Sequence, residues 1–162
     1  MPITKNVCCN GAFPYYGASG IVDYVNEFIF DDDLLLISED GANLLARTYP
    51  IAFSISGKTW VNNHAHVLRF KGIATQKLVE YYLNSIPLND FVSGMAQPKL
   101  NQKLLNIIPI PIPPVSEQQV IVAKLDEFSK ETKRLESLYQ RKLTALDELK
   151  KSLLHKVFAG EL

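Results

Sequence analysis

The C-terminal part of the chain, from residue 117 onward, constrains its fold more than any other segment. Prolines at 109, 111, 113 and 114 remove backbone donors, so the stretch before residue 116 is predicted to be extended. No glycine or proline interrupts residues 117–159, which predicts one continuous helix. A helix of about 43 residues at ~1.5 Å per residue is about 65 Å long, more than a domain of about 115 residues can cover. We therefore interpret the helix as a spacer or a dimer seam.

The two ends of this helix carry recognisable signals. Ser116 is predicted to be the N-cap, with Gln119 completing a capping box. Val115 and Val120 fit a hydrophobic staple around that cap. Gly160 is a suitable C′ residue at the far end. These signals bound the helix within residues 116–160.

A heptad repeat of apolar residues runs along the predicted helix. Two positions in it, Thr132 and Lys142, are polar and would help to fix register. Leaving the stripe in water would cost about 1.5–3 kcal/mol per large apolar side chain, so a second helix is expected to cover it. The alternative is that the helix packs on its own domain. The predicted seam comprises Ile121, Leu125, Phe128, Leu135, Leu138, Tyr139, Leu146, Leu149 and Leu153.

Composition limits the class of protein. With 162 residues, of which 47% are hydrophobic, one globular domain with an appendage is expected. The sequence contains no run of about 18 apolar residues, so no membrane-spanning helix is predicted. The N-terminus does not resemble a signal peptide. Lys+Arg and Asp+Glu both number 17, so nucleic acid would have to be bound by locally placed cations. The adjacent Cys8 and Cys9 are best read as buried thiols, and a cytoplasmic location is expected.

The N-terminal 115 residues read as an α+β domain, with strands first and helices later. Unbroken or alternating apolar runs predict strands at Leu34–Ile37 and Ile51–Ser56, the second with Ile51, Phe53 and Ile55 on one face. One or two strands are predicted within Trp60–Phe70. Helices are predicted at Ile73–Ile86, ended by Pro87, and near Asn101–Leu105. A loop is predicted between Ser93 and Pro98.

The sequence offers few candidates for catalysis. His64 and His66 would share a face of a strand, but a third metal ligand is not apparent, so hydrogen-bonding roles are favoured. Asp31, Asp32 and Asp33 could hold a cation, although a solvated turn is the simpler interpretation. Glycine-rich phosphate loops, nucleophile elbows and HExxH motifs are missing from the sequence. The chain is therefore predicted to be a binding module without intrinsic catalysis.

Several segments resemble the specificity subunits of type I restriction–modification enzymes. Those that resemble the target-recognition domain are PYYGASGIVDYVNEFIF (14–30), LLLISEDGANLL (34–45), WVNNHAHVLR (60–69) and GMAQPKLN (94–101). Those that resemble the family's conserved spacer helix are IPIPPVSEQQVIVAKLDEF (110–128) and LTALDELKKSLLHKVFAGEL (143–162). The resemblance implies a DNA-reading subunit that docks methyltransferase subunits and, with motor–nuclease subunits, directs restriction. Cofactors are not expected on this chain, because S-adenosylmethionine and ATP with Mg would be bound by those partners.

The chain departs from the family pattern in having one recognition domain, residues 1–115, and one long helix, residues 116–160. A full specificity subunit has two of each, with the helices packed antiparallel. The half-length form is therefore expected to make an antiparallel homodimer through its helix, and to recognise an interrupted palindrome. The family's usual segment upstream of Lys5 is also absent, so the first strand is expected to be missing or replaced.

The resemblance also suggests which residues read double-stranded DNA. Loop residues that can donate, accept or stack are the candidates for contacts in the major groove, with lysines serving mainly on phosphates. They are Tyr15, Tyr16, Lys58, Asn62, Asn63, His64, Lys99 and Asn101. Two alternatives remain open: a recognition-domain fragment of a fused DNA methyltransferase, and a regulatory or decoy half-subunit that binds methyltransferase subunits.

Overall fold

The computed structural model describes residues 11–94 and 97–160. The chain divides into two compact units, Met1–Val122 and Ala123–Leu162. The expectations for Cys8, for Cys9 and for the missing first strand fall on residues 1–10 and lie outside the described residues.

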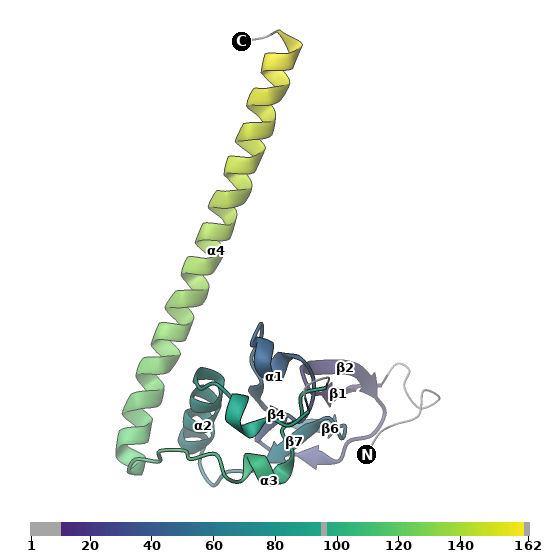
Figure 1. The fold of residues 1–162 in the computed structure, drawn as a ribbon, viewed down its shortest axis with the longest axis vertical. Helices are drawn as coiled ribbons and strands as arrows, with labels where there is room; N and C mark the ends of the chain where they lie inside the picture. The colour runs from purple at the N-terminus through teal and green to yellow at the C-terminus, as the bar shows by residue number, and fades with distance from the viewer. Residues whose placement is uncertain (1–10, 95–96, 161–162) are drawn as a thin grey trace. The chain divides into compact units, whose positions relative to one another are not determined.

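The strands of the first unit, as far as it is described, form two sheets (Figure 1). The first sheet has the order β2-β1-β6-β3, in which β1 and β6 are parallel and the other neighbours are antiparallel. Its strands are β1 (Phe13–Gly17), β2 (Gly20–Val25), β3 (Phe30–Asp31) and β6 (Lys58–Val61). The second sheet is antiparallel with the order β5-β4-β7, formed by β4 (Leu34–Ser38), β5 (Ala52–Ile55) and β7 (Ala65–Leu68).

Short and medium helices complete the unit, so the α+β prediction is confirmed. They are α1 (Asn43–Ala46), α2 (Ile73–Ser85), the 3₁₀ turn η1 (Asn89–Phe91) and α3 (Gln102–Leu105). The Asn84 side chain joins α2 to β5: its Oδ1 accepts from the backbone N–H groups of Ile51 and Ala52 at 2.9 and 3.1 Å, and its Nδ2 donates to the Ala52 carbonyl at 2.7 Å. This bridge fixes α2 against the edge of the second sheet.

The core lies on both faces of β4, whose five residues are all buried. Leu35 and Ile37 pack with Leu83 of α2 in one cluster, whereas Leu34 and Leu36 belong to a second cluster. Burial on both faces explains why the sequence of β4 is an unbroken apolar run.

Most of the predicted elements are confirmed, with one error of register. The strands predicted at Leu34–Ile37 and within Trp60–Phe70 and the helices at α2 and α3 are present. The prediction that Ile51, Phe53 and Ile55 share one face is wrong for Ile51. Phe53 and Ile55 pack in the second cluster, but Ile51 precedes β5 and is buried in the first cluster.

The long helix is α4 (Val115–Ala159), which Figure 1 shows as one unbroken coil. The predicted N-cap is wrong, because Val115 is already helical and the Pro114 carbonyl accepts from the N–H groups of Glu117 and Gln118. The predicted end is confirmed: Gly160 follows with a left-handed φ of 73°, which suits glycine at C′. Among the described residues, no helix is long and apolar enough to cross a membrane.

Gln118 fastens the first turn of α4 to the rest of the first unit. Its side chain is 3% exposed, accepts from the Thr75 hydroxyl of α2 at 2.6 Å and donates to the Pro113 carbonyl at 2.7 Å. Val122, one turn later, is also buried. The side of α4 that carries these two residues is therefore the side that packs on α2.

The heptad stripe remains largely exposed in the single chain. Phe128 is 67% exposed, Leu135 38% and Leu146 62%. Gln118 and Val122 are thus buried within the first unit, whereas Phe128, Leu135 and Leu146 of the second unit are exposed.

Candidate nucleic-acid interface

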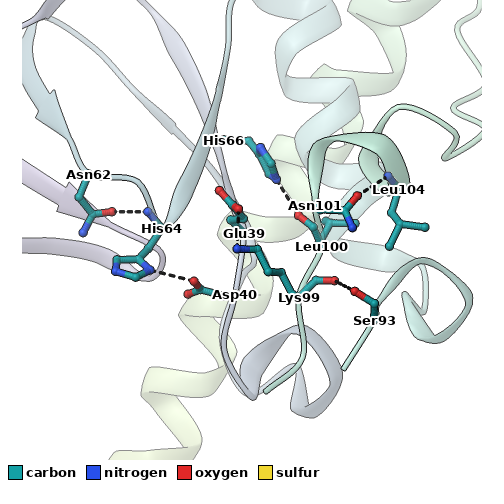
Figure 2. A network of polar contacts seen from close by, with 10 residues as sticks. All are labelled: Glu39, Asp40, Asn62, His64, His66, Ser93, Lys99, Leu100, Asn101 and Leu104. Carbon is teal, nitrogen blue, oxygen red and sulfur yellow. Dashed lines mark hydrogen bonds and ion pairs between the residues drawn. The ribbon is translucent and has the colours of Figure 1, made fainter. Parts of the chain in front are cut away.

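Three segments that are distant in sequence meet where β4 ends and β7 begins in the second sheet. They are residues 39–41 after β4, residues 62–64 between β6 and β7, and residues 97–101 before α3. Antiparallel pairing of Ser38 with Ala65 places the first two side by side, and the Glu39 N–H donates to the His64 carbonyl at 2.9 Å. The third segment joins through the Leu100 N–H, which donates to the Glu39 carbonyl at 2.8 Å. Figure 2 shows the resulting polar network.

One ion pair and one hydrogen bond from a histidine ring to a carboxylate give this network a layered arrangement. Lys99 Nζ lies 3.1 Å from Glu39 Oε1, and His64 Nδ1 lies 2.8 Å from Asp40 Oδ2. The side chains of Lys99 and His64 are about half exposed, at 50% and 51%, whereas those of Glu39 and Asp40 are only 23% and 18% exposed. The carboxylates are thus more buried than Lys99 and His64, and they hold these two side chains at the surface.

Backbone-directed amides give the network its shape. Asn62 Oδ1 accepts from the His64 N–H at 2.8 Å, which closes the turn between β6 and β7. Asn101 is the N-cap of α3, with its Oδ1 accepting from the Leu104 N–H at 3.0 Å. Asn63 is exposed in the same turn as His64. The side-chain oxygens of Asn62 and Asn101 therefore accept hydrogen bonds from nearby backbone N–H groups, whereas Asn63 is exposed to solvent.

Both histidines make hydrogen bonds, as predicted, but to different partners. His64 lies in the turn rather than in a strand, so the expectation that it shares a strand face with His66 is wrong. His66 is in β7, and its Nε2 contacts the Leu100 carbonyl at 2.6 Å. Within the described residues, no group of three or more His, Cys, Asp or Glu side chains is arranged to hold a metal ion. Asp32 of the aspartate run is paired with Arg69.

The side chains of the remaining candidates lie outside this network, although the Tyr16 carbonyl accepts from the Asn62 N–H at 2.9 Å. Tyr15 is buried at 8% exposure, and Tyr16 packs on Phe53 with ring centroids 6.1 Å apart. Burial, and to a smaller extent the charge of Tyr24, raises the pKa of the Tyr16 phenol above its ordinary value. Lys58 begins β6, and its ammonium lies 4.9 Å from the Phe28 ring centroid. It is separated from Asn62 by the length of β6, about 13 Å at ~3.3 Å per residue.

The structure adds Glu39 and Asp40 to the candidate site. Sequence reasoning missed them because acidic residues before a glycine look like an ordinary turn. Gly41, with a φ of 114°, does form that turn. Only the register between β4 and β7 places these carboxylates beside the 62–64 turn, and a register between strands that are distant in sequence has no local signal.

Comparisons with known proteins agree on one family. A family model described as the type I restriction modification DNA specificity domain matches residues 1–144. A putative type I restriction enzyme specificity subunit of Haemophilus influenzae is 38% identical over 128 residues, which cover 79% of this chain and 33% of that protein. The EcoDI type I specificity subunit of Escherichia coli is 38% identical over 65 residues, covering 40% of this chain and 15% of that protein.

Two solved structures share the fold. A structure from work on assembly and conformational transition of the type I R-M system aligns with a TM-score of 0.75 and 18% identity, covering all of this chain and 43% of that one. The crystal structure of a type I restriction–modification S subunit from M. genitalium aligns with a TM-score of 0.64 and 16% identity, covering 85% and 37%. The chain thus spans about a third of the Haemophilus relative's length and less than half of either solved chain.

Proposed function

The chain belongs to the family of type I restriction–modification DNA specificity domains, and from this premise we propose that it reads one half-site of a bipartite DNA target. The observation that carries the proposal is the extent of the family match, which covers the whole recognition unit and most of α4. The absence of catalytic motifs from the sequence supports a role in recognition, with methyl transfer and cleavage performed by partner subunits.

The 62–64 turn and the neighbouring Lys99 form the proposed reading surface. Asparagine side chains can donate and accept in pairs at the edges of bases in the major groove, which suits exposed Asn63. Lys99 and His64, held outward by carboxylates, suit contacts to phosphates or bases. Lys58 would contact phosphate farther along the duplex. Tyr15, Tyr16, Asn62 and Asn101 would mainly hold this surface in place, as their burial and backbone hydrogen bonds suggest.

The exposed stripe of α4 supports a homodimer. Two copies joined antiparallel through this helix would present two reading surfaces related by a twofold axis, and so would recognise an interrupted palindrome. The helix pair would set the number of unread base pairs between the half-sites. Methyltransferase subunits would dock on the chain and supply the S-adenosylmethionine site, and motor–nuclease subunits would supply the ATP and Mg site.

The decisive experiment is selection of bound duplexes by the chain in complex with its methyltransferase subunit. We expect a twofold-symmetric consensus with a fixed unread spacer. An asymmetric consensus would contradict the proposal that each chain of a symmetric dimer reads one half-site. Methylation or cleavage by the purified chain alone would contradict its assignment as a non-catalytic subunit.

A further inference from the structure

The hydrogen bond between His64 and Asp40 decides what the histidine ring can offer to a ligand. His64 Nδ1 lies 2.8 Å from Asp40 Oδ2, and an ionised carboxylate can only accept, so Nδ1 carries a proton and donates (Figure 2). The other ring nitrogen, Nε2, is then an acceptor when the imidazole is neutral and a donor when it is protonated. Because the side chain is 51% exposed, the ring is open to solvent and to a ligand.

The backbone places both partners of this hydrogen bond. Asp40 pairs with Lys99 in an antiparallel bridge. The His64 carbonyl accepts from the Glu39 N–H at 2.9 Å, and the His64 N–H donates to Asn62 Oδ1 at 2.8 Å. The carboxylate is therefore held beside the ring by contacts that do not depend on its own charge, and an amide at position 40 should leave the turn in place.

The charges of the network make a neutral His64 a poor partner for an anion. Among the residues drawn in Figure 2, one ammonium and two carboxylates leave a formal net charge of −1 when the histidines are neutral. Lys99 is paired with Glu39, so within this network the charge of Asp40 is the one that is not balanced. A phosphate approaching a neutral His64 would meet the lone pair of Nε2 with the Asp40 carboxylate behind it, and both would repel it. Protonation of the ring removes both repulsions.

We propose that His64 binds a DNA phosphate as an imidazolium, taking up a proton from solvent when the duplex binds, and that Asp40 is the positioning residue that stabilises this form. In the complex Nδ1–H donates to Asp40 and Nε2–H donates to a phosphate oxygen, so the cation lies between two anions. The inference rests on the proposed function and deepens it by assigning His64 to the DNA backbone of each half-site. A phosphate contact carries no base sequence, so it positions the reading surface while other side chains read the bases.

Proton uptake makes DNA affinity depend on pH in a defined direction. Because the bound state holds the additional proton, affinity rises as the pH falls and decreases as the pH rises. Uptake of one proton limits the change to about tenfold per pH unit for each chain. The imidazolium also neutralises a phosphate, so the salt slope of binding should be steeper at low pH by up to about 0.9 per chain. Of the other titratable groups in the network, Glu39 and Lys99 balance each other, which leaves Asp40 as the charge that the ring faces.

The chain in complex with its methyltransferase subunit provides the test, with DNA affinity measured between about pH 6 and 8.5. His64→Gln keeps an N–H donor but cannot take up a proton, so it should lose the pH-dependent part of the wild-type affinity. Asp40→Asn keeps an acceptor for Nδ1–H without the charge, so it should weaken the pH dependence without lowering the affinity at high pH. His155→Gln is the matched control, because it removes an exposed histidine of α4, and it should keep the wild-type profile.

Two further measurements count the proton and locate the phosphate. Isothermal titration calorimetry in buffers of different ionisation enthalpy should show that wild type takes up as much as about one proton per chain more than His64→Gln. Duplexes in which single phosphates are replaced by neutral methylphosphonates should include one position in each half-site that removes the same pH-dependent part of the affinity. That effect should not change with the base pair beside the replaced phosphate.

The possible outcomes separate this contact from the proposed function. A His64→Gln complex with the wild-type pH profile and proton uptake would overturn the phosphate contact and leave DNA reading standing. A loss that is independent of pH and confined to one base pair would also overturn it, because a neutral Nε2 would then accept from an exocyclic amine of adenine or cytosine. An Asp40→Asn complex that loses affinity equally at every pH would overturn the positioning role of Asp40. A wild-type complex that selects no DNA sequence would overturn the proposed function, and this contact with it.

Discussion

Replacement of Leu135 by glutamate is the sharpest test of the helix seam. Leu135 is 38% exposed in the single chain and lies near the middle of the heptad stripe. Covering that fraction of a leucine, where full burial is worth about 1.5–3 kcal/mol, gives about 0.6–1.1 kcal/mol per copy. The twofold axis makes each loss count twice, and each carboxylate placed in the seam adds about 1–3 kcal/mol. The total of at least about 3 kcal/mol predicts a dimer at least about a hundredfold weaker.

Sedimentation velocity across a concentration series measures this change, and circular dichroism checks that the helix remains. Ser137→Glu is the matched control, because it introduces the same charge two residues along, at an exposed position off the stripe. We expect the control to dimerise like wild type. A Leu135→Glu chain that dimerises as tightly as the control would refute both the seam and the magnitude given for it.

Three further substitutions test the recognition unit. Asn84→Ala should lower the free energy of unfolding by about 2–4 kcal/mol in urea titrations, because two N–H groups and one carbonyl at Ile51 and Ala52 lose their partner. Gly94→Ala should destabilise by about 1 kcal/mol or more in thermal melts, since φ is 83° and a Cβ would lie 2.7 Å from the Gln97 carbonyl oxygen. Lys99→Ala should weaken binding to all DNA sequences alike and reduce the salt slope by about one per chain, whereas exposed Lys71→Ala should leave the slope unchanged.

The sequence predicted correctly those helices and strands that depend on interactions between residues close together in the chain. The apolar run of β4, the proline that ends α2 and the glycine that ends α4 each act within a few residues, and their elements appear where expected. The helix start was misplaced because Ser116 has the composition of a cap, whereas the N–H groups of Glu117 and Gln118 donate to the Pro114 carbonyl. The Gln118 side chain in the first turn is held by Thr75, which is distant in sequence and gives no local signal.

The candidate site was only half predictable for a related reason. Asn62, Asn63, His64 and Lys99 were found from their loop chemistry and their resemblance to family segments. Their acidic partners depend on long-range pairing: β4 with β7, and residue 99 with residues 39 and 40. Side-chain type identifies groups that can bind, whereas strand register decides which of them meet.

The neutral charge of the chain connects the reading surface to the seam. With 17 basic and 17 acidic residues there is no general attraction to DNA, and the pairing of Lys99 with Glu39 further limits what each copy contributes. A single reader that neutralises only a few phosphates gains little from counterion release. Two readers joined by a rigid seam bind the second half-site at high effective concentration, so their binding energies combine. Leu135→Glu, which alters no residue near the reading surface, should therefore reduce affinity for the complete palindrome far more than affinity for an isolated half-site. Equal losses on both targets would mean that the two readers do not act together.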